Sequence, residues 1–76
     1  MNKYYINVCC LVGGLFSPIQ KPNKVDDSDF EITFIDMFKH HLGRKPTTKE
    51  LQKFKTKEEI YVDDGDVTYI FYHETI

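Results

Sequence analysis

The aspartates of residues 61–66 are the first candidates for chemistry in this chain. Asp63, Asp64 and Asp66 stand close together, and neighbouring carboxylates are ligands that Mg²⁺ and Ca²⁺ prefer. A calcium-binding loop requires acidic ligands at alternate positions, and these aspartates lack that spacing. The run Asp-Asp-Gly-Asp also has the composition of a tight turn, because Asp tolerates a left-handed backbone and Gly has no Cβ. We therefore expect a surface turn here and no dedicated metal site.

Histidines and cysteines are the second set of candidates. His40 and His41 are consecutive, and consecutive helical residues point about 100° apart, so the pair does not form a chelating face. His73, Cys9 and Cys10 are the remaining soft ligands. Cysteine catalysis needs a thiol activated by a neighbouring histidine, and two adjacent cysteines on a strand give no sign of one. We expect no metal site, cofactor or catalytic residue, although the sequence leaves open whether the histidines bind a metal ion.

Tyr61-Val62-Asp63-Asp64 resembles the Tyr-x-Asp-Asp motif of reverse transcriptases, in which a hairpin presents two aspartates to catalytic metal ions. The resemblance covers four residues. A polymerase palm also needs a further, distant carboxylate and a far longer chain. A chain of 76 residues buries only about 60% of the surface that it exposes when unfolded, which leaves little scaffold for a deep substrate cleft. We therefore predict that the protein is not an enzyme.

The N-terminal part of the chain predicts two strands joined by a tight turn. Residues 3–12 are rich in Tyr, Ile, Val and Cys, which is typical of a strand. The Gly-Gly pair at residues 13–14 is a hairpin signal, so residues 15–20 can return as a second strand. Pro18 lacks an N–H and restricts that strand to a sheet edge. Residues 21–27 are expected to be a polar connector.

Two helices are expected in the middle of the chain. Ser28 and Glu31 fit a capping box, and the apolar residues that follow recur at helical spacing. Gly43 can close this helix, because glycine adopts the left-handed conformation without strain. A second, short helix is expected to have Thr47 as its cap and Glu50 as the box partner.

The C-terminal part predicts a hairpin with an apolar period of two and a turn at Asp64-Gly65. One face of this hairpin carries Ile60, Val62, Val67, Tyr69 and Phe71. We predict a single α+β domain over residues 1–76, with a small antiparallel sheet of three or four strands and two helices on one face. The order is β(β)ααββ, and the sequence leaves open whether residues 15–20 form the optional strand.

The charges are segregated along the chain. Residues 39–57 contain seven basic residues and one acidic residue, whereas residues 58–76 contain six acidic residues and no Lys or Arg. Such blocks create local fields of opposite sign on a small molecule. The alternative is that they are solvated surface, placed partly by the preference of acids for helix starts.

Residues 42–51, Leu-Gly-Arg-Lys-Pro-Thr-Thr-Lys-Glu-Leu, are similar to the helix–Gly-Arg-x-Pro-Thr–Glu-Leu junction of bacterial sigma factors, where two helices pack beside DNA. The surrounding basic residues can contact phosphates. The chain departs from the sigma-factor pattern in its aromatic first helix and in having no apolar recognition helix after residue 57. The residues expected to contact nucleic acid in this reading are Lys39, Arg44, Lys45, Lys49 and Lys53.

A protein-binding face is the alternative that we favour. Eleven aromatic residues exceed what a core of this size can bury. If the helices cover one face of the sheet, Tyr61, Ile70 and Tyr72 form an apolar patch on the other, and such a patch usually marks an interface. Alternatively, the patch is covered by Leu15, by Phe16 or by a second copy of the chain. A homodimer is therefore a further possibility that the sequence leaves open. The residues expected to bind the partner are Tyr61, Asp63, Asp64, Asp66, Ile70 and Tyr72.

We therefore predict a small, non-enzymatic regulator or inhibitor that binds another protein, with nucleic-acid binding as the second hypothesis. The acidic rim of the patch suits a basic partner, for example a nucleic-acid-binding protein. The composition, rich in Phe, Tyr, Ile, Asn and Lys and without Ala, is typical of AT-rich genomes such as those of phages. Adjacent cysteines outside any disulfide framework indicate a reducing compartment, the cytoplasm or that of a phage host. No stretch approaches the ~20 apolar residues of a membrane span, so we expect no membrane partner.

Overall fold

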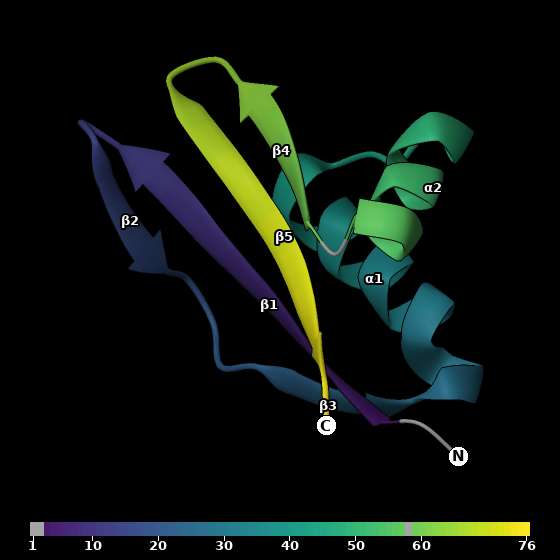
Figure 1. Cartoon of the computed structure of the whole chain (residues 1–76). Helices are drawn as coiled ribbons and strands as arrows, with labels where there is room; N and C mark the ends of the chain where they lie inside the picture. Colours follow the sequence, from purple (N-terminus) through teal and green to yellow (C-terminus); the bar gives the residue numbers. More distant parts are fainter. Residues whose placement is uncertain (1–2, 58) are drawn as a thin grey trace.

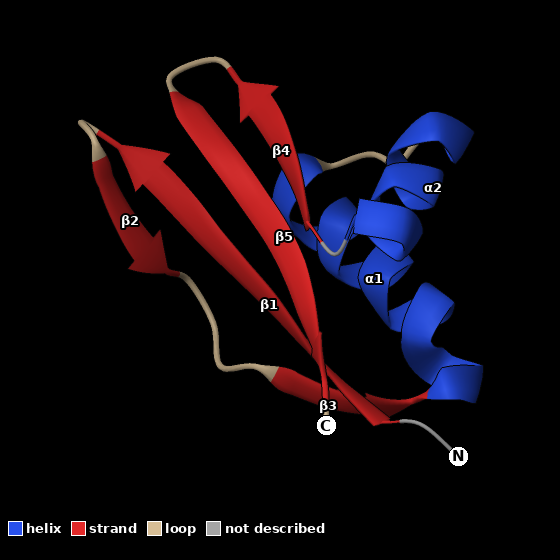
Figure 2. Ribbon diagram, in the orientation of Figure 1, coloured by secondary structure: helices blue, strands red, loops and turns tan. Residues whose placement is uncertain are grey.

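The computed structural model describes residues 3–57 and 59–76, and within them the chain forms five strands and two helices (Figure 1). In chain order they are β1 (Lys3–Val12), β2 (Leu15–Pro18), β3 (Asn23–Asp26), α1 (Asp27–Leu42), α2 (Thr48–Lys57), β4 (Glu59–Asp64) and β5 (Val67–Thr75). The strands pair antiparallel in the order β2-β1-β5-β4, and β3 pairs with the first residues of β1. Both helices lie on one side of the sheet (Figure 2). The predicted α+β fold class is confirmed, with one strand more than expected.

The β1–β2 hairpin forms as its sequence predicts. Val12 pairs with Leu15, and the two loop residues between them are Gly13 at φ 60° and Gly14 at φ 83°. A two-residue hairpin turn with positive φ at both positions strongly favours glycine, which explains the Gly-Gly pair. β2 is the edge strand that tolerates Pro18. The optional second strand is therefore present.

The prediction of a polar connector over residues 21–27 is wrong for its second half. Asn23–Asp26 is β3, and it pairs with β1 so that Val25 lies opposite Tyr4. β2 and β3 use successive stretches of the same edge of β1, which would otherwise leave unpaired main-chain groups. A four-residue strand of largely polar composition does not show the period-two pattern on which the prediction relied.

The start of α1 also differs from the prediction. The helix begins at Asp27, and its N-cap is Asp26, which has extended backbone angles and makes no capping hydrogen bond through its side chain. The Ser28–Glu31 capping box is therefore wrong, because β3 runs directly into the helix and places the start of α1 earlier. Asp27 and Asp29 occupy the first turn, where the helix dipole favours negative charge.

The other helix ends are as predicted. Gly43 has φ 72°, and its N–H donates to the carbonyl oxygen of Lys39 at 2.9 Å, which closes α1. At the start of α2, the Thr47 N–H donates to the Glu50 carboxylate at 2.8 Å. The Glu50 N–H donates in return to the Thr47 hydroxyl at 3.1 Å. The predicted capping box of α2 is confirmed.

The turn between β4 and β5 lies one residue later than predicted. Asp64 pairs with Val67, so the loop residues are Gly65, at φ 69°, and Asp66. Moving the turn by one residue shifts each cross-strand partner by two, and a shift of two keeps every side chain on its face. The predicted division of the hairpin into two faces is therefore correct.

Stacked aromatic rings fill the space between the helices and the sheet. The rings of Phe34 from α1 and Phe54 from α2 stack with centroids 4.0 Å apart and planes 8° from parallel. Phe71 of β5 meets the Phe34 ring edge-on at 5.6 Å, and all three side chains are fully buried. The sheet adds a further set of buried side chains, namely Ile6, Val8, Ile60 and Val62. One face of the sheet is thus covered, and the helices leave the other face open.

Candidate functional site

The open side of the sheet, which we call the outer face, is defined by strand register. The helices pack on the face that carries Ile6, Val8 and Phe71, and side chains alternate between faces along a strand. On the outer face, Ile70 lies between Cys9 of β1 and Tyr61 of β4 as cross-strand neighbours. The other outer-face residues of these three strands are Tyr5, Asn7, Leu11, Glu59, Asp63, Thr68, Tyr72 and Glu74.

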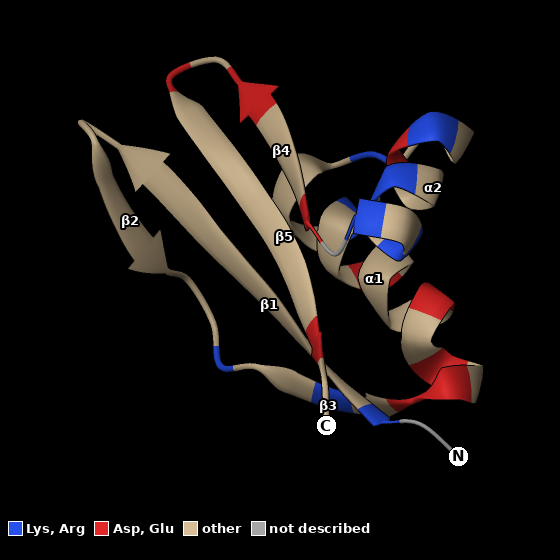
Figure 3. Cartoon of the chain, in the orientation of Figure 1, with Lys and Arg blue, Asp and Glu red and all other residues tan. Residues whose placement is uncertain are grey.

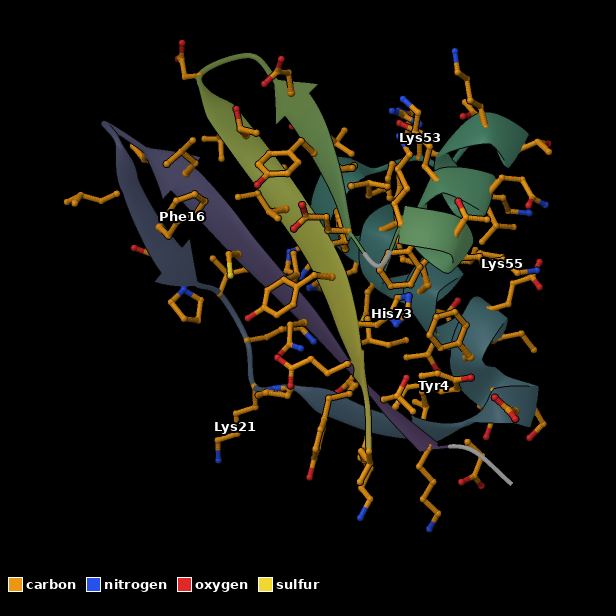
Figure 4. The ribbon with its side chains drawn as sticks, viewed as in Figure 1. Tyr4, Phe16, Lys21, Lys53, Lys55 and His73 are labelled. Carbon is orange, nitrogen blue, oxygen red and sulfur yellow. The ribbon has the colours of Figure 1, made fainter. Side chains whose placement is uncertain are left out.

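A shallow hollow of about 330 Å³ lies at the middle of the outer face. It is lined by Cys9, Phe16, Glu59, Tyr61, Ile70 and Tyr72. Phe16 and Tyr61 are 61% and 59% exposed, and Figure 4 shows Phe16 on β2, away from both helices. Ile70 between them is only 4% exposed. The hollow therefore has a closed apolar floor and two accessible aromatic rings at its rim.

The structure brings together part of the predicted protein-binding set. Tyr61, Ile70 and Tyr72 line one hollow, as expected, but Ile70 forms its floor and is not part of an exposed patch. Asp63 is on the same face, where its carboxylate accepts a hydrogen bond from the Thr68 hydroxyl at 2.6 Å. Asp63 therefore lies on the outer face, on the edge strand β4.

The other two predicted aspartates lie elsewhere. Asp66 is in the turn between β4 and β5. Asp64 falls on the same side of β4 as Val62, toward the helices, and its charge contributes to a raised pKa of Arg44. Asp64, which was expected at the rim of the patch, therefore does not share the outer face, because side chains alternate along β4.

Three residues of the hollow, Cys9, Phe16 and Glu59, are missing from the predicted set. Phe16 appeared in the sequence reasoning only as an alternative cover for the patch, and Cys9 only as a candidate metal ligand. Each is brought to the hollow by pairing between strands: Cys9 lies opposite Ile70, and Phe16 lies opposite Leu11. The Gly-Gly hairpin turn was the signal that could have placed Phe16 on this face.

The Tyr72 hydroxyl lies in a partly buried position on the outer face. Burial raises the pKa of Tyr72 above its ordinary value, and the adjacent Cys9 thiol and Glu74 carboxylate add to the shift. The phenol therefore keeps its proton across the physiological range and can donate a hydrogen bond. Cys9 and Cys10 are both free thiols, and they lie on opposite faces of β1 as predicted.

The β1–β2 hairpin also exposes apolar side chains beyond the helices, and Val12 and Leu15 are on the face opposite to the hollow. Val12 is 52% exposed and Leu15 is 73% exposed, while every residue of β2 is exposed. Residues 4–20 contain no charged side chain. An edge strand without charge and with exposed apolar groups is a surface that natural sheets usually avoid unless it is covered by a partner.

The basic residues form a second surface on the helical side. Figure 3 shows Lys and Arg concentrated along α2 and the preceding loop, with the acidic residues at the β4–β5 turn and at the start of α1. Lys39, Lys45, Lys49 and Lys53 are exposed, as nucleic-acid contacts would require. The structure places these predicted residues on α1, α2 and the loop that joins them.

Arg44 differs from these lysines because its side chain already forms an ion pair with Glu50. Its guanidinium donates two hydrogen bonds to the Glu50 carboxylate, at 2.9 and 3.0 Å, and lies 4.9 Å from the Phe38 ring centroid. The hydrogen bond to Glu50 raises the pKa of Arg44, and the same bond lowers the pKa of Glu50. Arg44 therefore serves to close the α1–α2 junction, and its charge is largely compensated.

The histidines are separated in the structure. His73 is buried, and its Nε2 donates to the Phe54 carbonyl oxygen at 3.0 Å, since a carbonyl can only accept. His41 lies 2.8 Å from the Gln20 side-chain oxygen, and burial, with the neighbouring His40 charge, lowers its pKa. Among the described residues, no group of three or more His, Cys, Asp or Glu side chains is arranged to hold a metal ion.

Comparison with known proteins gives no relative: no protein-family model, curated protein sequence or solved structure matches the chain. In the part of the chain that the structure describes, neither α1 nor α2 is long and apolar enough to cross a bilayer.

Proposed function

We propose that this protein acts without catalysis, by binding another protein through the outer face of its sheet. The observation that carries the proposal is the open hollow on this face, whose apolar floor is flanked by the exposed rings of Phe16 and Tyr61. Exposed aromatic anchors beside a desolvated apolar floor are the arrangement from which most binding energy in interfaces comes. The role that suits such a small binding face is that of a regulator or inhibitor of its partner.

The charges around the hollow define the kind of partner. Glu59 lines the hollow, and Asp63 and Glu74 share its face. Residues 58–76 carry six acidic residues and no Lys or Arg. A complementary surface has an apolar centre, which fills the hollow, and Lys or Arg at its rim. Basic proteins, including those that bind nucleic acids, present such surfaces, and the acidic rim would speed their association.

Affinity capture with matched variants tests this proposal. Phe16→Ser removes an aromatic ring from the hollow, and Ile32→Ser removes an apolar side chain of nearly the same exposure, 60% against 61%, from α1. Both variants and the original chain are tagged and used to capture proteins from nuclease-treated lysate. We expect one set of proteins to be retained by the original chain and by Ile32→Ser, released by rising salt, and lost with Phe16→Ser. Equal capture by all three would contradict the proposal.

Nucleic-acid binding is the second candidate, and the exposed lysines of the α1–α2 region favour it. In this case phosphate contacts come from Lys39, Lys45, Lys49 and Lys53, while Arg44 is held by Glu50. α2 is followed by β4, so the described chain has no further helix to enter a groove of DNA. Any binding would therefore be mainly to the phosphate backbone and would weaken steeply with salt.

Fluorescence anisotropy with a labelled DNA duplex separates the two candidates. If the second candidate holds, the duplex binds at low salt, and Lys49→Glu with Lys53→Glu abolishes binding while Phe16→Ser leaves it unchanged. If the protein-binding proposal holds, the duplex does not bind at physiological salt, and the lysine variant still captures the protein partner.

A further inference from the structure

The free edge of β4 is a second place where the structure offers unused binding groups. β4 is the last strand in the sheet order β2-β1-β5-β4 and pairs only with β5 among the described strands. In an antiparallel pair, alternate residues direct their N–H and C=O groups to the partner strand and the others direct them away. Every second residue of β4 therefore presents main-chain donors and acceptors at the open edge, ready to pair with another strand.

A groove runs beside this edge. It has a volume of about 520 Å³ and lies between α2 and β4. Its walls are Glu50, Lys53 and Lys57 from α2 and Glu59, Ile60 and Tyr61 from β4. Figure 1 shows α2 to one side of β4, and Figure 4 shows Lys53 on α2 beside β4. A strand added to β4 would thus have its side chains within reach of α2.

The helical wall of the groove is positively charged. Lys53 and Lys57 are four residues apart, so they lie on the same face of α2. Neither makes an ion pair within the described chain, whose ion pairs are Arg44 with Glu50 and Lys55 with Glu31. Glu50, the acid on the same wall, is neutralised by Arg44 at 2.9 Å. The two lysines are therefore the uncompensated charges of the helical wall, and Glu59 is the carboxylate on the β4 wall opposite them.

We propose that the groove between α2 and β4 binds an extended, acidic peptide segment of another protein, which joins the sheet as an additional strand beside β4. Main-chain hydrogen bonds to β4 supply affinity, and the acidic side chains of the peptide pair with Lys53 and Lys57, which supplies specificity. A nucleic acid fits less well, because it has no main-chain amide groups with which to pair along a strand edge. This site is distinct from the outer face, although Tyr61 borders both.

Selection from a library of random displayed peptides tests the chemistry of the ligand. The original chain, the variant Lys53→Glu with Lys57→Glu, and the control Lys45→Glu with Lys49→Glu are immobilised; the two variants have the same net charge. We expect the original chain to enrich acidic peptides. These should bind the groove variant about tenfold more weakly, because two ion pairs are replaced by like-charge repulsion, and bind the control within about twofold. Absence of enrichment, enrichment without acids, or equal loss in both variants would overturn the proposal.

Backbone methylation of a selected peptide tests the strand addition itself. Only one alternating set of peptide amides can face β4, so N-methylation of that set should abolish binding while methylation of the other set should spare it. Equal effects of the two sets would refute strand pairing. Sedimentation velocity gives a further check: a dimer that the selected peptide does not dissociate would make a second copy the occupant of the edge and would also overturn the proposal. Phe16→Ser should keep full peptide affinity, so failure of the outer-face proposal is recognised separately.

Discussion

Replacing Phe54 by alanine tests the claim that stacked aromatic rings hold the helices on the sheet. Phe54 is the only buried residue among those described in α2, and its ring is fully enclosed. It stacks on Phe34 at 4.0 Å and on Phe30 at 5.5 Å, and it meets His73 edge-on at 4.8 Å. Removing it would leave a cavity lined by rings that are themselves packed and cannot easily close it.

The expected loss of stability is large relative to the total free energy of unfolding. Deleting a buried phenylalanine ring from a core lowers the free energy of unfolding by about 3–5 kcal/mol. A domain of 76 residues has a free energy of unfolding of roughly 4–11 kcal/mol. We therefore expect Phe54→Ala to lower the melting temperature by about 12 °C or more, since each kcal/mol corresponds to roughly 4–8 °C in a domain of this size.

Far-UV circular dichroism, recorded during heating and during urea unfolding, measures this change. It replaces tryptophan fluorescence, because the chain contains no tryptophan. Phe16→Ala is the matched control, because the same atoms are removed from a ring that is 61% exposed, and it should cost less than about 0.5 kcal/mol. A loss below about 1 kcal/mol for Phe54→Ala, or equal losses for the two variants, would refute the account of the core.

Three further changes test the helix ends and their charges. Thr47→Ala removes the N-cap of α2 and should lower the free energy of unfolding by about 1 kcal/mol in urea titrations; no change would show that the capping box contributes nothing. Gly43→Ala forces a Cβ into a left-handed backbone and should cost about 1 kcal/mol, with Gly43→Asn tolerated better; equal losses would argue against strain as the cause. The hydrogen bond from Arg44 lowers the pKa of Glu50, so its contribution is present above the unfolded pKa of about 4.3 and is lost as the pH falls through the folded pKa. Glu50→Gln should therefore reduce the fall in stability on acidification, measured as unfolding free energy against pH, and an unchanged acid profile would contradict this role.

The elements with strong local signals are those that the sequence predicts well. The Gly-Gly pair specifies a two-residue turn with positive φ, and the structure has Gly13 and Gly14 in that conformation. Thr47 and Glu50 satisfy each other's main-chain N–H groups, which is a purely local interaction. In such cases the residues that determine the structure are neighbours in the chain, so their pattern is visible in the sequence.

The features that the sequence does not predict depend on contacts between distant segments. β3 forms because the edge of β1 is available beside it, and its own residues have little strand character. Its presence moves the start of α1 to Asp27 and makes the Ser28 prediction wrong. Ile70 is buried because Cys9 and Tyr61 flank it from neighbouring strands. No local pattern specifies the pairing of β1, β5 and β4, whereas the Gly-Gly turn could have placed Phe16 on the outer face.

The affinity of the purified partner for the outer face tests the central claim most directly. Isothermal titration of the captured protein is carried out with the original chain, Phe16→Ser and Ile32→Ser. If the hollow is the binding site, Phe16→Ser weakens binding by about 2 kcal/mol, the loss typical of a central aromatic anchor, and Ile32→Ser leaves it unchanged. If Phe16→Ser binds as tightly as the original chain, or if Ile32→Ser is weakened as much, the outer face is not where this protein binds its partner.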